Sequence, residues 1–165
     1  MAKTMPTTWL DISISAQHCQ LWHHDKLVFS AAVSTALNGP GEKEGSGGTP
    51  RGWHQIRACI GQGQPVNTVF VGRRPTGERY TPDLGKTFPD RDWILTRILW
   101  LSGLELGKNR LGNVDTMRRY IYIHGCPDAL PMGQALSHGC IRMHNRDLLT
   151  LFEQVKPGLK VWIHE

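Results

Sequence analysis

The sequence contains no long apolar run. Nowhere in its 165 residues do about 18 apolar residues follow one another, the length that a helix needs to cross a bilayer. The first thirteen residues, MAKTMPTTWLDIS, also have no apolar core of signal-peptide length behind their basic residue. The sequence therefore predicts no membrane span. We expect a cytoplasmic protein, or a periplasmic one if a leader has been removed.

The sequence also lacks any block of like charge. Lysine and arginine number 19 against 14 acidic residues, a formal net charge of +5 at pH 7, but basic pairs such as Arg73–Arg74 and Arg118–Arg119 lie far apart. No RNA-reading aromatic motif accompanies them. We expect no nucleic-acid partner, and an acidic small substrate explains the charge equally well.

Cysteines are few, and no two lie close together. The four stand at positions 19, 59, 126 and 140, a spacing that resembles neither a secreted disulfide framework nor the paired cysteines of structural zinc sites. The sequence predicts free thiols, no metal and no cofactor, with Cys19 and Cys59 as small core residues. One zinc alternative stays open, because His124–Cys126 and His138–Cys140 are two His-x-Cys pairs, and side chains two apart on a strand share a face.

Alternating apolar residues favour a mainly β (α+β) fold. Trp9–Ile14 has the period of a half-buried strand. No repeat of 20–50 residues and no linker divides the chain, so residues 1–165 are predicted to form a single domain. The glycine-rich residues 38–48 and the residues 73–89 are expected as loops. Further strands are predicted at Cys19–Trp22, Leu27–Val33, His54–Ile60, Arg119–Ile123 and Leu159–Ile163.

Two segments have helical spacing. Asp90 suits the N-cap of a helix whose apolar residues, from Trp93 to Leu101, recur every three or four positions. Asn145 suits the N-cap of a second helix over about 146–155. We therefore assign Asn145 and Asp147 to the helix start and expect no chemistry from them. The count is two or three helices in a mainly β domain.

The chemistry is concentrated in two short segments. His124-Gly125 ends a predicted strand, and Cys140 follows sixteen positions later in the sequence Ser137-His138-Gly139-Cys140. A thiol attacks as the thiolate, so a nucleophilic cysteine needs a nearby base, which a histidine at a strand end can supply. Glycine before the cysteine lets consecutive backbone N–H groups point at a developing oxyanion.

These residues resemble the L,D-transpeptidase catalytic domain, also called the YkuD-type domain. The matching motifs are His124-Gly125 and Ser137–Arg142 (SHGCIR), with Thr49–Gly52 (TPRG) as the family's TPxG turn and Val33–Thr35 before the glycine-rich loop. The resemblance extends from Trp9 to Ile163 and implies a β-sandwich or barrel with the cysteine on a loop at one end. One residue departs from the pattern: Cys126 stands where threonine is expected after His-Gly.

The resemblance also implies roles and a reaction. Cys140 is the nucleophile and His124 its base, with the Gly125 carbonyl orienting the imidazole. The substrate is a peptidoglycan stem tetrapeptide ending in D-Ala, attacked at the carbonyl of its third residue, a diamino acid. Backbone N–H groups around Gly139 and Cys140 hold the oxyanion. His138 completes the catalytic set, and the residues expected to bind substrate are Ser137 and Arg142, the latter through its forked guanidinium.

Several alternatives accompany this interpretation. His138 and Ser137 can instead shape the loop, and Arg142 can be a solvated surface charge. With no leader in view, we expect a cytosolic L,D-carboxypeptidase that removes the terminal D-Ala from muropeptides during wall recycling. The alternatives are a periplasmic L,D-transpeptidase that forms 3–3 crosslinks and, in another class, a non-catalytic peptidoglycan-binding module, which would survive the loss of Cys140.

Overall fold

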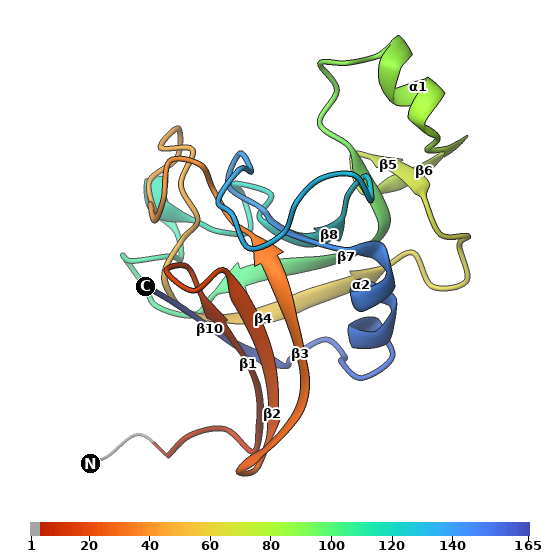
Figure 1. Cartoon of the computed structure of the whole chain (residues 1–165). Helices are drawn as coiled ribbons and strands as arrows, with labels where there is room; N and C mark the ends of the chain where they lie inside the picture. Colours follow the sequence, from red (N-terminus) through yellow and green to blue (C-terminus); the bar gives the residue numbers. More distant parts are fainter. Residues whose placement is uncertain (1–3) are drawn as a thin grey trace.

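The computed structural model describes residues 4–165 and is built mainly from strands (Figure 1). This confirms the mainly β class. Two helices accompany the strands, α1 (Pro82–Thr87) and α2 (Asn145–Phe152), with one short 3₁₀ turn at Gly112–Val114. The strands are β1 (Thr8–Ser13), β2 (His18–His23), β3 (Lys26–Ser34), β4 (Gly52–Ile60), β5 (Thr68–Val71), β6 (Arg74–Arg79), β7 (Ile94–Gly103), β8 (Tyr122–Gly125), β9 (Ile141–Met143) and β10 (Lys160–His164).

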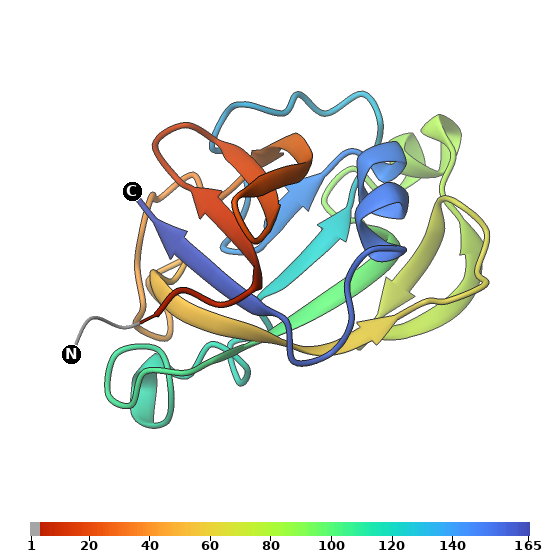
Figure 2. The same cartoon turned by 90° about the horizontal axis from the view of Figure 1, so that it is seen from below.

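One sheet contains all ten strands and curls back on itself. Its order is β4-β10-β1-β2-β3-β9-β8-β7-β5-β6, and an additional pairing of β4 with β7 closes a ring of eight strands. The β5–β6 hairpin extends from β7 outside this ring, and α1 lies beside it (Figure 1). Helix α2 packs against β7 and β8 (Figure 2). Closure gives each ring strand a partner on both sides over at least part of its length.

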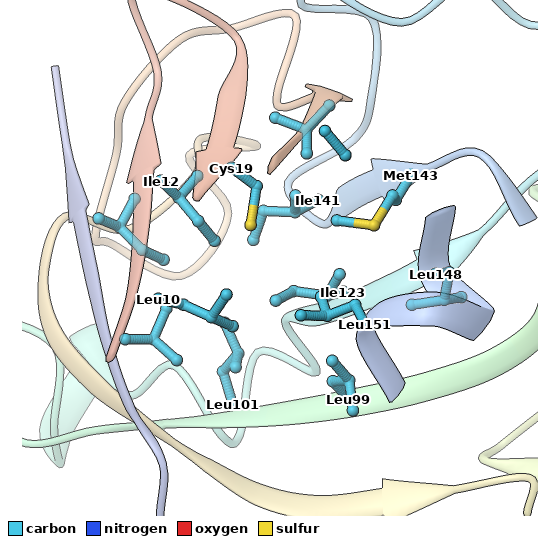
Figure 3. Close-up of a cluster of buried hydrophobic side chains, with 14 of the residues drawn as sticks. Leu10, Ile12, Cys19, Leu99, Leu101, Ile123, Ile141, Met143, Leu148 and Leu151 are labelled. Atoms are coloured by element: carbon cyan, nitrogen blue, oxygen red, sulfur yellow. The ribbon is translucent and has the colours of Figure 1, made fainter. Parts of the chain in front are cut away.

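The core fills the inside of the ring. Alternate residues of each strand point inward because successive side chains of a strand face opposite ways. Leu10 and Ile12 from β1 meet Ile123 from β8 and Ile141 from β9, all with no exposed surface (Figure 3). Cys19 lies fully buried among them, in keeping with its assignment as a small core residue, and Cys59 packs partly buried at the edge of the same cluster.

The predicted helix from Asp90 to about residue 101 is wrong, because this segment forms strand β7. The strand pairs with β4, β5 and β8, and its two faces lie in different apolar clusters. Leu99 belongs to the main core, whereas Ile98 packs with Phe70 and Tyr122. A central strand that is buried on both faces has a nearly continuous run of apolar residues. Such a run also contains apolar residues three or four positions apart, which is why the segment was predicted to be a helix.

The expected surface connection over residues 73–89 contains two short elements that the sequence analysis missed. β6 pairs with β5, and α1 follows. The Leu84 amide donates to Thr81 Oγ1 at 3.2 Å, so Thr81 is a side-chain N-cap, and Pro82 occupies the first turn. Neither α1 nor α2, within residues 4–165, is long and apolar enough to cross a membrane.

Helix α2 is found where it was expected, but it starts and ends differently. Asn145 is the first helical residue rather than the N-cap. The helix ends at Phe152 rather than near residue 155. The N-cap position belongs to His144, whose side chain makes no capping hydrogen bond. The strand expected at 119–123 is also displaced, to Tyr122–Gly125. The Asn145 side chain is instead buried in a network beneath the candidate site.

Candidate active site

The parallel strands β8 and β9 bring the motif residues together. Ile123 lies opposite Ile141, and His124 lies opposite Arg142. Both isoleucines point into the core (Figure 3). Because side chains alternate along a strand, His124 and Arg142 lie on the other face. Cys140, two positions before Arg142, packs beside Tyr122 on that same face. The sheet therefore gathers the histidine, the cysteine and the arginine on one side.

The Cys140 thiol is held by backbone groups. Its Sγ–H donates to the Tyr120 carbonyl at 3.3 Å, and the Tyr122 amide donates to the sulfur at 3.3 Å. The surrounding protein shields the sulfur from water and raises the pKa of Cys140 to about 12, although the Tyr122 amide acts in the opposite direction. The thiol is therefore protonated at neutral pH, and it requires a base in order to attack.

His124 is suited to be that base. The imidazole is buried, and its Nδ1 lies 2.6 Å from the Gly125 carbonyl. A carbonyl oxygen only accepts, so Nδ1 carries the proton and Nε2 keeps a free lone pair. Burial lowers the pKa of His124 below its ordinary value, and the hydrogen bond to Gly125 offsets only part of this effect. The ring is thus a neutral acceptor at neutral pH.

The loop that contains Cys140 is fixed by two hydroxyl groups. Ser137 Oγ donates to the Cys140 carbonyl at 2.6 Å and accepts from the Gly139 amide at 3.3 Å. Thr49 Oγ1, from the TPRG turn, donates to the Gly139 carbonyl at 2.9 Å. Gly139 has φ +135°, a conformation that L residues with a side chain rarely adopt. The serine is therefore a loop-shaping residue, whatever else it does.

These contacts narrow the set of oxyanion donors. The Gly139 N–H is already committed to Ser137, whereas no turn or loop hydrogen bond of residues 4–165 engages the Cys140 N–H. Of the two amides expected from the sequence, the one on Cys140 is available for a developing negative charge.

Arg142 is paired with an aspartate that the sequence analysis did not connect to the site. Only 11% of the Arg142 side chain is exposed, which excludes a freely solvated surface charge. Its Nη2 lies 3.3 Å from Asp92 Oδ1, and its Nη1 donates to the Leu136 carbonyl at 3.3 Å. Nδ1 of His138 lies 3.6 Å from the other oxygen of Asp92, and 76% of the His138 side chain is exposed. Asp92 thus bridges two residues of the SHGCIR segment.

A cavity of about 720 Å³ adjoins these residues. One wall comes from the segment around α1 and the start of β7, and the other from residues 127–142. Aromatic and charged side chains line it together, among them Tyr80, Arg91, Asp92, Trp93, His138 and Arg142. The size falls in the range of sites that hold a small ligand, and the mixed charges suit a peptide with both amine and carboxylate groups.

The zinc alternative is not supported by the placement of its four side chains. Cys126 is fully buried, and its thiol points to the Met143 carbonyl at 3.8 Å, whereas His138 lies largely in solvent against Asp92. Among residues 4–165, no group of three or more histidine, cysteine or acidic side chains is arranged to hold a metal ion.

Two contributors to the site escaped the sequence analysis. Asp92 lies fifty positions from Arg142, in a segment interpreted as a helix start, and no local pattern links the two. The Thr49 turn was identified only through the family motif, without the hydrogen bond from its hydroxyl to the Gly139 carbonyl. Both contacts join segments that are distant in sequence and meet only through the pairing of strands in the sheet.

Comparison with known proteins agrees with this architecture. Two curated relatives named as L,D-transpeptidase YkuD match a short segment, one from Bacillus licheniformis (46% identity over 46 residues) and one from Bacillus subtilis (40% over 47 residues). Each match covers 28% of this chain, and it covers 28% and 29% of the relatives, respectively.

Solved structures match over nearly the whole chain. An Enterococcus faecium L,D-transpeptidase superimposes with a TM-score of 0.58 at 13% identity, over 96% of this chain and 50% of that one. L,D-transpeptidase 3 from Mycobacterium tuberculosis, in complex with a faropenem-derived adduct, gives a TM-score of 0.59 at 17% identity, over 99% and 62%. The chain thus spans about half to two thirds of these proteins, and the likeness shows a shared fold.

The family match covers far more of the chain than the short segments shared with the two curated relatives. The family model described as the L,D-transpeptidase catalytic domain, YkuD, matches residues 7–163. This range includes the TPRG turn, the His-Gly strand end and the SHGCIR segment. The resemblance identified from those motifs is confirmed, and so is the L,D-transpeptidase-type β-barrel architecture. The chain belongs to the L,D-transpeptidase catalytic domain (YkuD) family.

Proposed function

We propose that this chain is a cysteine acyl transferase that acts on peptidoglycan stem peptides, with Cys140 as the nucleophile and His124 as its base. One observation supports this most directly. His124, a neutral histidine with a free Nε2 on β8, and the protonated thiol of Cys140, directly before the neighbouring β9, lie on the same side of the sheet. The named activity of the relatives supplies the substrate class.

The proposed reaction begins at the third residue of a tetrapeptide stem. Cys140 Sγ attacks the carbonyl carbon while His124 Nε2 accepts the thiol proton. The Cys140 N–H stabilises the oxyanion of the tetrahedral intermediate. When the intermediate collapses, the C–N bond breaks and His124 returns the proton to the departing D-Ala amine. The product on the enzyme is a thioester at Cys140.

We propose hydrolysis as the main fate of this thioester, so that the chain acts as an L,D-carboxypeptidase. Cys140 is partly exposed, and the His138 side chain two positions earlier is 76% exposed. The sulfur itself is shielded in the free protein, but the loop beside it is open to solvent, and we propose that water reaches the thioester from that side. All four cysteines are unpaired, as is usual in a reducing compartment, which supports a role in the cytosol on muropeptides released by wall turnover.

Transfer to a second stem peptide is the alternative. The structural relatives are named as transpeptidases, and the first half of the reaction would be identical. The two outcomes differ only in whether water or an amine attacks the thioester. A transpeptidase must therefore hold an acceptor amine next to Cys140.

Product analysis separates the two activities. Purified disaccharide tetrapeptide is incubated with the protein, and the products are identified by mass spectrometry. We expect tripeptide and free D-Ala, with little dimer even at high substrate concentration. Dominant dimer, or a native protein that fractionates with the periplasm, would favour the transpeptidase instead. No turnover of either kind would contradict the proposed function and favour the non-catalytic binding module.

A penem offers a test that needs no natural substrate. The Mycobacterium tuberculosis relative was crystallised with a faropenem-derived adduct. If Cys140 is the nucleophile, faropenem should add one covalent adduct to the wild-type protein and none to Cys140→Ala. An adduct on another residue would point to a different reactive group.

A further inference from the structure

Strand β7 is irregular at the point where it passes the candidate base. It pairs Leu95 with Gly125 and Ile98 with His124, so Thr96 and Arg97 are two extra residues opposite no partner. Thr96 has φ +76° and no exposed surface. A β-branched residue in this region is a conformational outlier, and bulges of this kind recur beside active sites, where they redirect side chains. The surrounding structure must hold this threonine in place.

The Thr96 hydroxyl connects the bulge to the start of α2. It accepts a hydrogen bond from the backbone N–H of Asn67 at 3.0 Å and donates to the side-chain oxygen Oδ1 of Asn145 at 2.6 Å. Asn145 is 2% exposed. Its Nδ2 donates to the Cys126 carbonyl at 2.8 Å and also lies near Asp128 Oδ1 at 3.0 Å and Asn67 Oδ1 at 3.2 Å. The asparagine thereby links the bulge to the backbone just after His124-Gly125.

Gly125 lies between these two groups. A Cβ on Gly125 would collide with Asn145 Oδ1 and with the Leu95 carbonyl oxygen, and it would press on the Thr96 side chain. The glycine is therefore clamped by the bulge and the asparagine together. Its carbonyl is the group that accepts from His124 Nδ1 at 2.6 Å. The position of that carbonyl decides which ring nitrogen of His124 carries the proton.

We propose that Thr96 and Asn145 are positioning residues. They fix the Gly125 carbonyl, and through it they hold His124 as the Nδ1–H tautomer with Nε2 free for the Cys140 proton. Neither residue touches the reacting atoms. This inference rests on the proposed function for its kinetic consequence, but its consequence for the tautomer holds whatever the substrate.

The test compares Thr96→Val with Thr96→Ser. Valine keeps the β-branched shape and removes only the hydroxyl, whereas serine keeps the hydroxyl. Histidine side-chain nitrogen NMR, with the His124 signals assigned by difference against His124→Gln, reports the tautomer. We expect one Nδ1–H tautomer in the wild type and in Thr96→Ser. In Thr96→Val we expect a mixture, with kcat for tetrapeptide hydrolysis reduced by about 100-fold and KM nearly unchanged.

Asn145→Ala should reproduce the Thr96→Val result, and Asn109→Ala is its matched control. Asn109 is also fully buried, and its amide makes hydrogen bonds to Glu105, Arg51 and Trp53, away from His124. Both variants remove a buried amide, so a general loss of stability would affect both. We expect the mixed tautomer only in Asn145→Ala. If that variant fails to fold, Asn145→Asp keeps an acceptor for Thr96 but turns a charged oxygen toward the Cys126 carbonyl and Asp128, so it should also give the mixed tautomer.

The outcomes separate the two hypotheses. A single Nδ1–H tautomer and wild-type kcat in both Thr96→Val and the Asn145 variant would overturn the positioning role. An equal loss in Asn109→Ala would also overturn it. If the wild type hydrolyses no stem peptide while the tautomer still depends on Thr96 and Asn145, the proposed function fails and the positioning role stands.

Discussion

At the scale of single residues, Cys140 and His124 are the proposed nucleophile and base, and we call them the neutral pair because both are uncharged in the free protein. Burial raises the pKa of the thiol to about 12 and lowers the pKa of the imidazole, so both groups lose their charged forms. In the proposed mechanism, the proton therefore passes from sulfur to Nε2 during the attack rather than before it. This differs from a cysteine–histidine ion pair, in which the thiolate exists already in the free enzyme.

The nucleophile is tested most directly by Cys140→Ala. Turnover should be lost, while the fold remains intact because the residue lies on a loop at the edge of a small apolar cluster. Steady-state hydrolysis of tetrapeptide measures the first effect and circular dichroism the second. Cys59→Ala, at another half-buried cysteine, is the matched control and should retain activity. Activity of Cys140→Ala within roughly tenfold of wild type would exclude the cysteine mechanism.

The neutral pair predicts a particular pH dependence for the free thiol. Because the pKa of Cys140 is raised to about 12, its alkylation by iodoacetamide should be slow at neutral pH and should keep rising through the alkaline range. Mass spectrometry of the alkylated peptide against pH measures the rate. A plateau that is already reached near neutral pH would show a preformed thiolate and contradict the neutral pair.

Arg142 tests the recognition of substrate. Lysine cannot reproduce the forked contacts of a guanidinium, so Arg142→Lys should lower kcat/KM. The loss should correspond to about 1.5–3 kcal/mol of transition-state stabilisation, the range for hydrogen bonds to charged groups. Arg146→Lys, at an exposed position on α2, is the control and should have little effect. An unchanged kcat/KM in Arg142→Lys would leave Arg142 with only its structural pairing to Asp92.

At the scale of elements, three separate segments meet at the Cys140 loop. The TPRG turn after the glycine-rich loop supplies Thr49, β8 supplies His124, and β9 begins directly after Cys140. Thr49 also accepts from the Ala36 amide at 3.0 Å, so its hydroxyl ties the turn to both the loop and the chain after β3. The site therefore depends on hydrogen bonds between elements more than on the shape of any one of them.

Thr49→Val isolates this connection. The change keeps the shape but leaves the Ala36 amide and the Gly139 carbonyl without their partner. We expect a loss of about 1–3 kcal/mol in the free energy of unfolding, because both groups lie in the interior. We also expect a lower kcat, because the Cys140 amide loses its orientation. Denaturant unfolding and steady-state kinetics measure the two effects.

Thr150→Val, at an exposed threonine of α2, controls for the chemical change. Its hydroxyl lies near solvent, so stability and activity should both stay close to wild type. Wild-type stability and kcat in Thr49→Val would show that the turn contributes nothing to the loop.

At the scale of the whole molecule, two buried neutral histidines make the fold sensitive to acid. His54 lies inside the barrel, with Nδ1 3.0 Å from the Gly52 carbonyl and Nε2 2.9 Å from the Thr116 hydroxyl. Burial lowers its pKa from 6.5 to about 4, and the pKa of His124 is lowered for the same reason. The unfolded chain therefore binds protons more readily than the folded one.

Stability should consequently fall as the pH drops below about 6.5, the ordinary histidine value. The loss continues toward pH 4, where His54 becomes protonated in the folded state, and it reaches on the order of 3 kcal/mol for His54 alone. Urea unfolding between pH 7.5 and 4.5, at about half-unit steps, measures the slope. His54→Gln should be less sensitive to acid than wild type, and equal slopes in the two proteins would contradict this assignment.

The sequence by itself determined the features that depend on near neighbours. Alternating residues such as Leu10 and Ile12 predict strands because the side-chain period belongs to the local backbone. The His-Gly and SHGC segments indicated a cysteine–histidine site, because each motif lies within a few residues. The family followed from the same segments and is confirmed by the match over residues 7–163.

The tertiary structure alone decided what depends on contacts between distant segments. The segment after Asp90 became strand β7 because β4, β5 and β8 bury both of its faces, which outweighs its helical spacing. Asp92 contacts Arg142, fifty positions away in the sequence. Asn145, expected to cap a helix, instead accepts a hydrogen bond from Thr96. Such pairs are created when distant strands pair in the sheet, and no local periodicity encodes them. The candidate nucleophile and base were therefore readable from the sequence, as was the role of the Gly125 carbonyl, but the contacts of Asp92, Thr96 and Asn145 were not.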